Sequence, residues 1–234
     1  KKYFINITKT ICPKKIISNN LNIFGYKFKN AKPNAKYYIY QHSYIYDAEF
    51  ENFKKLYKNI SVDIFFCFDE RHKKIFSKIL RTKFIIIGSF RNNFVKINNK
   101  KFFNRINYIA EYRQKNQLKI SKNNEIYILK LLDKFCIKNN FSLLISLNSN
   151  RSDKLISKKK EIKYYYNITK MFHYNNLNVY QNSQSSIISI SMSSNAGIEI
   201  LSRGIPVMYF DLMSINNKNF KNPYFYSRSM FYLN

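Results

Sequence analysis

One segment carries most of the information about architecture: Ser189-Ile-Ser-Met-Ser-Ser-Asn-Ala-Gly-Ile-Glu-Ile-Leu-Ser-Arg-Gly-Ile-Pro-Val-Met-Tyr-Phe210. Alternating isoleucines over 186–191 predict a buried β-strand, and the pattern over 195–203 then predicts a short helix. Gly204 is a residue type that commonly ends a helix, and the apolar run over 205–210 predicts the next strand. A strand, a helix and a second strand in close succession are typical of a parallel sheet covered by helices.

The junction between this strand and helix is the first candidate binding site. Ser193, Ser194 and Asn195 bring hydroxyls and backbone N–H groups to a helix N-terminus, which favours phosphate. Gly197 would let a ligand or a neighbouring backbone approach closely, and Glu199 could accept hydrogen bonds from ribose hydroxyls. An ordinary junction would use Ser194 or Asn195 only as the helix N-cap. The spacing alone leaves both interpretations open.

The segments before this window repeat the same alternation. The clearest helix is expected over 125–138, because its apolar residues recur on one face. A strand over 141–147, a helix over 161–171 and a short strand over 177–180 are expected to follow. The region 125–234 is therefore predicted to be a Rossmann-like domain. Such domains bind ligands at the carboxyl ends of their strands.

The N-terminal half predicts a second α/β unit. Strands are expected over 37–42, 62–68 and 84–87, and helices over 47–58 and 71–80. A further strand over 105–112 would close a first domain at 1–112, with the polar segment 113–124 as the linker. Because the chain begins at Lys1 rather than at a methionine, we expect part of the N-terminal domain to be missing.

Two motifs resemble those of a known family. The pattern Ser193-Ser194-x-x-Gly197-x-Glu199-x-Leu201-x-x-Gly204-x-Pro206-Val207 resembles the donor-site strand and helix of GT-B glycosyltransferases, above all bacterial surface-carbohydrate biosynthesis proteins. Tyr40-Gln41-His42-Ser43, followed by Asp47, resembles their Gln-His-Gly element, with Ser43 in place of glycine. The elements between these motifs follow in the order that this family has.

The resemblance implies an α/β fold of two Rossmann-like domains that face a cleft. It also implies a donor site in which Ser193, Ser194 and Gly197 lie beside the phosphates of a nucleotide-sugar and Glu199 beside its ribose, while Asn195 is a further donor-binding candidate. The acceptor would be a glycan or a lipid-linked sugar in surface polysaccharide biosynthesis. Similar motifs occur in some sugar epimerases, so an epimerase or a non-catalytic homologue is an alternative.

Three further residues are candidates for the chemistry of transfer. His42 is the candidate base for the acceptor hydroxyl, because its ordinary pKa lies near neutrality. Asp47 would orient His42 or act as the base itself. Arg151, in the loop after the strand over 141–147, is a candidate cation for the leaving diphosphate. No Asp-x-Asp motif is present, so we expect a metal-independent enzyme without a cofactor.

The charge of the chain favours anionic partners. Forty-one lysine and arginine residues oppose 13 acidic residues, which gives a formal charge of +28. The lysines are spread along a chain rich in Asn, Ile, Phe and Tyr, so biased composition explains much of this charge. A peripheral contact with an anionic membrane is expected. A basic nucleic-acid-binding protein is the second hypothesis, although it gives no reason for the motif at Ser193–Val207.

The cysteines and the hydropathy pattern indicate the compartment. Cys12, Cys67 and Cys136 are far apart and form no Cys-x-x-Cys pair, so neither a disulfide framework nor a metal site is expected. No apolar stretch approaches the roughly 20 residues of a membrane span. We therefore expect a cytoplasmic protein that contacts the inner face of the membrane.

Overall fold

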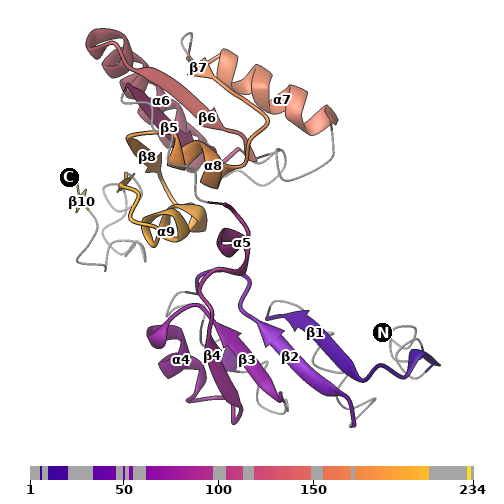
Figure 1. The fold of residues 1–234 in the computed structure, drawn as a ribbon. Helices are drawn as coiled ribbons and strands as arrows, with labels where there is room; N and C mark the ends of the chain where they lie inside the picture. The colour runs from indigo at the N-terminus through magenta and orange to yellow at the C-terminus, as the bar shows by residue number, and fades with distance from the viewer. Residues whose placement is uncertain are drawn as a thin grey trace. The chain divides into compact units, whose positions relative to one another are not determined.

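The computed structural model describes residues 6, 10–20, 34–45, 50, 53–54, 62–96, 104–112, 119–148, 155–169, 172–210 and 231–232 of the 234-residue chain. Internal contacts divide the chain into two compact units, Lys1–Phe94 (unit 1) and Val95–Asn234 (unit 2). Each unit is built on a parallel β-sheet (Figure 1). The predicted α/β class, with parallel sheets, is therefore confirmed.

Unit 1 contains a four-stranded parallel sheet in the order β1-β2-β3-β4. Its elements are β1 Lys15–Asn19, β2 Lys36–Tyr40, β3 Ile64–Cys67, α4 Glu70–Phe76, β4 Lys83–Ile86 and α5 Phe90–Asn93. The core is aromatic, with the Phe65 ring packed 4.6 Å from that of Phe76 and 5.7 Å from that of Phe84. Because the strands are parallel, the segments that follow them all lie at one edge of the sheet.

Unit 2 contains a six-stranded parallel sheet in the order β10-β9-β8-β5-β6-β7. Its elements are β5 Arg105–Ile109, α6 Lys119–Asn139, β6 Ser142–Ser146, α7 Leu155–Tyr166, β7 Phe172–His173, α8 Val179–Gln184, β8 Ile188–Ser191, α9 Asn195–Leu201, β9 Val207–Tyr209 and β10 Phe231–Tyr232. Counted along the chain, these six strands have the order 3-2-1-4-5-6 of the doubly wound Rossmann fold. The order reverses between β5 and β8, and ligands of such folds bind beyond the carboxyl ends of the strands at this switch point.

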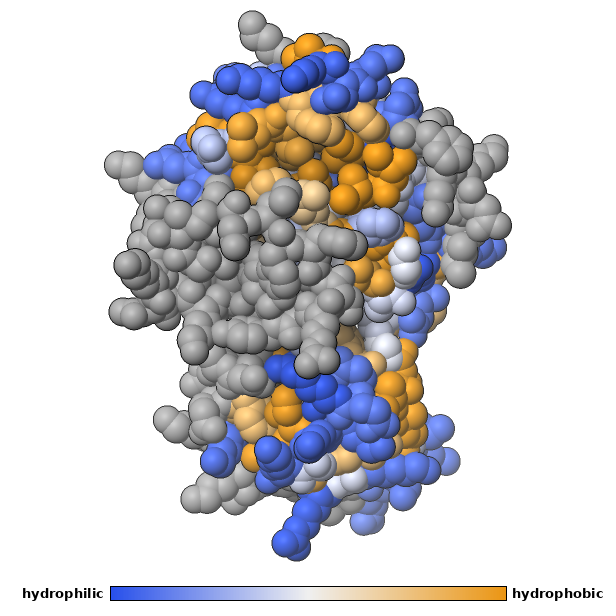
Figure 2. Space-filling view, turned by 90° about the vertical axis from the view of Figure 1, so that its left-hand side faces the viewer, coloured by the Kyte–Doolittle hydropathy of each residue, from blue (hydrophilic) through white to orange (hydrophobic). Residues whose placement is uncertain are grey.

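The core of unit 2 combines apolar and polar side chains. Leu129 of α6 and Leu143 of β6 are fully buried in its apolar cluster. Between the sheet and α8 lies a polar layer, in which the Asn107 amide donates to Ser183 (2.9 Å) and accepts from Ser146 (2.7 Å). Hydrophobic residues also reach the surface of this unit (Figure 2).

Three sequence-based predictions are wrong: one domain boundary, one linker boundary and the type of one element. The strand predicted over 105–112 is β5, which pairs with β6 and β8 and so belongs to unit 2 rather than to a first domain ending at 112. Helix α6 begins at Lys119, within the segment 113–124 predicted as a linker. The strand predicted over 177–180 is replaced by α8. The cause is a capping box, in which Asn178 and Gln181 each bond to the backbone of the other.

Candidate functional site

The junction of β8 and α9 forms a local turn at the switch point of unit 2. Ser194 is the N-cap of α9, and its hydroxyl accepts from the Ala196 N–H at 3.3 Å. The Ser194 N–H donates to the Ser191 hydroxyl at 3.0 Å. Ser193 is exposed, and Ser194 and Asn195 are half-buried. The three residues predicted here therefore lie together at the surface of unit 2, not sealed in its core.

A carboxylate already occupies the exposed end of this junction. Glu111 follows β5 and accepts hydrogen bonds from both the backbone N–H and the hydroxyl of Ser193, the latter at 2.6 Å. Because β5 and β8 are neighbours in the sheet, this contact spans the switch point. The sequence analysis missed Glu111, since it assigned this strand to the other domain.

The buried carboxylate of Glu125 fixes the backbone of Glu111. The backbone N–H of Glu111 donates to Glu125 Oε1 at 3.3 Å. Glu125 is fully buried in α6 and also accepts from the hydroxyls of Tyr108 (3.2 Å), Tyr165 (2.8 Å) and Tyr164 (3.0 Å). Burial, together with the negative charge of Glu125, raises the pKa of Tyr108 and Tyr165 well above the usual value for tyrosine. Both phenols stay protonated at neutral pH and fix the end of β5.

Gly197 meets a side chain rather than a ligand. A Cβ atom at Gly197 would lie 2.1 Å from the Tyr209 hydroxyl oxygen and 2.7 Å from Cζ of the same ring. The Tyr209 hydroxyl in turn donates to the Ser194 carbonyl at 3.0 Å. The group that approaches Gly197 is therefore the Tyr209 side chain, which ties β9 to the start of α9, and approach by a ligand stays a prediction.

Glu199 is directed into unit 2. It is 6% exposed, and its Oε2 accepts from the hydroxyl of Tyr180 in α8. This contact joins α8 to α9. Of the two carboxylates near the junction, Glu199 is therefore buried, whereas Glu111 is only half-buried at the sheet edge.

In unit 1, the segment after β2 carries the second candidate site. Gln41 is buried, and its carbonyl accepts from the Phe68 N–H (3.0 Å) while its amide donates to the Ser43 carbonyl (2.9 Å). The His42 N–H donates to the Asn20 side chain at 2.8 Å. Gln41 thereby fixes the turn from within, and His42 is left half-buried at the carboxyl edge of the sheet.

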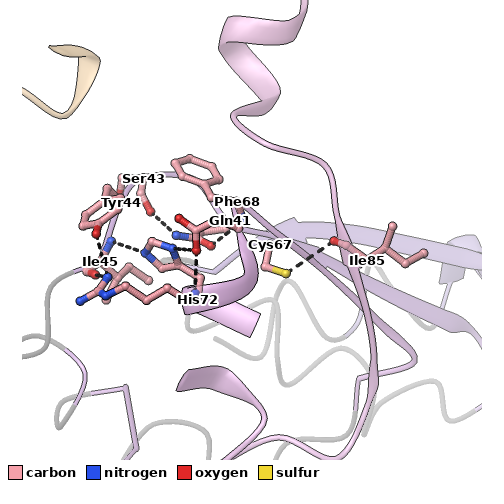
Figure 3. Close-up of polar contacts among 10 residues, drawn as sticks. Gln41, Ser43, Tyr44, Ile45, Cys67, Phe68, His72 and Ile85 are labelled. Carbon is pink, nitrogen blue, oxygen red and sulfur yellow. Dashed lines mark hydrogen bonds and ion pairs between the residues drawn. The ribbon is translucent and has the colours of Figure 1, made fainter. Parts of the chain in front are cut away.

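A buried histidine and its carboxylate hold the same segment from below (Figure 3). His72 of α4 is 1% exposed, and its Nε2 accepts from the Ile45 N–H at 3.2 Å. Nε2 therefore carries no proton, and Nδ1–H donates to Asp69 at 2.7 Å. Burial would raise the pKa of Asp69, but its hydrogen bonds with His72 and the positive charge of Arg71 lower it overall. Asp69 is also the N-cap of α4, where its carboxylate accepts from the His72 N–H.

Arg91 of α5 contacts the candidate base. Its Nη2 touches Nε2 of His42 and lies 3.2 Å from Nδ1. A guanidinium can only donate, so in a hydrogen bond between the two side chains an imidazole nitrogen would be the acceptor. The sequence analysis did not single out Arg91.

Two predicted site residues, Asp47 and Arg151, lie outside the described residues. Within the described part of the chain, no group of His, Cys, Asp and Glu side chains is arranged to hold a metal ion. None of the helices in that part combines the length and the apolarity that crossing a bilayer requires.

One comparison with known proteins, a family model, points to surface carbohydrate. A family model described as "putative O-antigen biosynthesis protein" matches residues 40–232, most of the chain. No curated protein matches it significantly. Among solved structures, one chain of the "Glycosylation Associate Protein (Gap123) complex from Streptococcus agalactiae" is similar, with a TM-score of 0.46 and 14% sequence identity. The match covers 85% of the present chain and 42% of that chain, so the present chain spans less than half of its length.

Proposed function

The chain belongs to the O-antigen biosynthesis family whose model covers residues 40–232, and from this premise we propose that it is a glycosyltransferase. It transfers a sugar or a related unit from a nucleotide-activated donor to a glycan or lipid-linked acceptor. In this proposal unit 2 binds the donor, unit 1 supplies the base, and the two units together form an enzyme of the GT-B type.

One observation carries the proposal: the contact between Glu111 and Ser193 at the switch point of a sheet with strand order 3-2-1-4-5-6. Dinucleotides and nucleotides bind at this point in other sheets of this order, with an acidic residue on the ribose. The exposed Ser193 and the half-buried Ser194 and Asn195 supply hydroxyl, amide and N–H groups for the donor's phosphates.

The Glu111 carboxylate sets a condition on how the donor binds. A diphosphate and a carboxylate repel each other, so they do not share the N–H and hydroxyl of Ser193. Donor binding therefore either displaces Glu111 from Ser193 or brings ribose hydroxyls to Glu111. Glu199 is the second ribose candidate, and it would accept a ribose hydroxyl only after Tyr180 releases its oxygen. Arg151 is the proposed cation for the diphosphate.

In unit 1 we assign the base to His42 and its orientation to Asp47. Arg91 has two effects in this proposal. Its positive charge opposes protonation of His42, and its guanidinium provides donors for an anionic group of the acceptor. Gln41, Asn20 and His72 fix the backbone around His42.

A donor-binding experiment tests the proposal in unit 2. The full chain is heated with UDP-, GDP-, CMP- and CDP-linked sugars in turn. A donor at about one hundred times its Kd adds about 2.7 kcal/mol to the folded state, which raises the melting temperature by about 5–10 °C. Ser193→Ala should weaken binding about tenfold or more, because it removes a donor to a charged group. Ser202→Ala, at the other end of α9, is the matched control.

A transfer assay then tests unit 1. With the donor identified, His42→Ala should keep the thermal shift but lower the rate of sugar transfer by about a hundredfold or more.

Two outcomes of the donor-binding experiment would contradict the proposal. If no nucleotide-sugar stabilises the chain, or if Ser193→Ala and Ser202→Ala bind the donor equally well, the donor site is not at Ser193 and the proposal fails.

A further inference from the structure

The outer face of α6 exposes apolar side chains in a row. Tyr127, Leu131 and Phe135 are 57%, 43% and 49% exposed, although the opposite face of the same helix is packed into the core of unit 2. Side chains four residues apart are neighbours on a helix surface, so these three form one continuous stripe. Phe135 also stacks on Phe141, with ring centroids 5.8 Å apart, so the stripe is anchored at one end while about half of each side chain stays exposed.

A row of cations runs beside the apolar stripe. Lys130, Lys134 and Lys138 are all exposed and share the same spacing of four residues. The two rows therefore advance together along α6, and each lysine lies next to an apolar neighbour. Lysine stems can pack on apolar surface while the ammonium groups remain in water. Figure 2 shows an apolar area on this unit that hydrophilic residues border.

None of the acidic residues that the structure describes in unit 2 is fully exposed. Each is buried or half-buried and accepts a hydrogen bond from an uncharged donor. They are Glu111 (from Ser193), Glu125 (from Tyr165), Asp133 (from Thr169), Glu161 (from the Asn148 N–H) and Glu199 (from Tyr180). The field outside α6 is consequently dominated by lysine.

From these rows we propose that the outer face of α6 docks on an anionic lipid surface. Tyr127, Leu131 and Phe135 enter the boundary between headgroups and acyl chains, while the lysine row contacts acidic headgroups. This mode of binding needs both an apolar row and a cationic row along one helix, and α6 has both. The inference is independent of the proposed transfer, since it concerns another face and uses no donor.

Two other occupants fit the face less well. A second copy of the chain would bring the same lysine row against a protein of formal charge +28, so like charges would oppose the pairing. A nucleic acid would satisfy the lysines, but its phosphate backbone offers no apolar surface to bury Leu131. An anionic lipid surface can bury the apolar row and also contact the lysine row.

Vesicle flotation of the full chain tests the inference with two matched pairs of variants. The vesicles contain phosphatidylcholine alone or mixed with phosphatidylglycerol. Wild-type chain should bind the anionic vesicles preferentially. Leu131→Ser should weaken that binding about fivefold, whereas Leu177→Ser, with a similarly exposed leucine in the same unit (45%), should not. The charge reversals K130E/K134E should weaken it more than K159E/K160E on α7, which change the net charge equally.

Three results would overturn the inference. Equal losses for the two charge reversals, with Leu131→Ser binding like wild type, would mean that net charge alone attracts the chain to lipid. A dimer in light scattering that Leu131→Ser converts to a monomer would mean that the face binds a second copy. Binding to duplex DNA that Leu131→Ser weakens as strongly as vesicle binding would assign the face to nucleic acid.

Discussion

Glu111 and Ser193 are the residues on which the proposed donor site depends most. Their contact is one of a chain of hydrogen bonds that runs from the buried Glu125 through the Glu111 N–H to the exposed serine. These bonds orient the Ser193 N–H and hydroxyl toward Glu111, so a donor phosphate that takes them must first displace this carboxylate.

The cysteines give a residue-scale prediction. Burial raises the pKa of both Cys67 and Cys136 to about 11, whereas Cys12 is exposed. The thiolate is the reactive form, so at pH 8 only about one in a thousand of each buried thiol is reactive. We expect one fast-reacting thiol with Ellman's reagent in the folded chain and three after unfolding. Cys12→Ser should remove the fast phase, and a fast phase that persists in this variant would contradict the burial.

Single residues were predicted unevenly from the sequence. The serines at the junction and His42 could be singled out as candidates because each follows a recognisable strand. Glu111 and Arg91 were not, because each acts on a residue far away along the chain, 82 and 49 positions from its partner. The order of strands in a sheet determines which distant residues come into contact. Hydrophobic periodicity within a segment carries no information about that order.

At the scale of elements, β8, α9 and β9 form the part of the fold that sequence patterns predicted best. Gly204 has a φ of +74°, the left-handed conformation expected of a residue just beyond a helix. Helix α8 was missed because Leu177, Val179 and Tyr180, around its first residues, look like part of a short strand. The capping pair Asn178 and Gln181 was the signal that would have identified it.

Gly197→Ala tests how tightly α9 packs on β9. The added methyl group would overlap the Tyr209 ring, so we expect a loss of about 1–3 kcal/mol of folding free energy in urea unfolding. The same substitution should cost less in a Tyr209→Phe background, where the hydroxyl nearest to the new methyl group is gone. An identical cost in both backgrounds would show that the tyrosine is not the obstacle.

Asn107→Leu tests the polar layer under α8. Leucine has the same branched shape but no amide, so the hydroxyls of Ser146, Ser183 and Ser189 would each lose a buried partner. We expect destabilisation of about 2–4 kcal/mol by chemical denaturation. Asn123→Leu, on the exposed surface of α6, is the control and should stay within about 0.5 kcal/mol of wild type. Equal effects of the two substitutions would mean that the layer adds nothing.

At the scale of the whole molecule, the sequence predicted an α/β chain with parallel sheets, and the structure confirms this class. The division into units was predicted in the wrong place, because β5 has the composition of either sheet and only its pairing with β6 and β8 assigns it. The family match agrees with the surface-carbohydrate context, while the GT-B type and the donor remain proposals.

Alkaline pH should destabilise the molecule through its buried tyrosines. Burial raises the pKa of Tyr37 to about 12, and it also raises the pKa of Tyr108 and Tyr165 well above the usual value. An unfolded tyrosine releases its proton near pH 10. The stabilisation is therefore complete below about pH 10 and is lost as the pH rises above it. Urea midpoints from pH 8 to 11 should fall, and less steeply for Tyr108→Phe. A wild-type midpoint that is constant over this range would contradict the burial of these phenols.

Amide hydrogen exchange of the full chain with a stabilising nucleotide-sugar tests the proposed donor site most directly. The account predicts that the donor slows exchange in residues 110–112 and 192–196, the segments that follow β5 and β8, and that Ser193→Ala reduces this protection. Protection confined to other strand ends, or no protection with any UDP-, GDP-, CMP- or CDP-linked sugar, would contradict it.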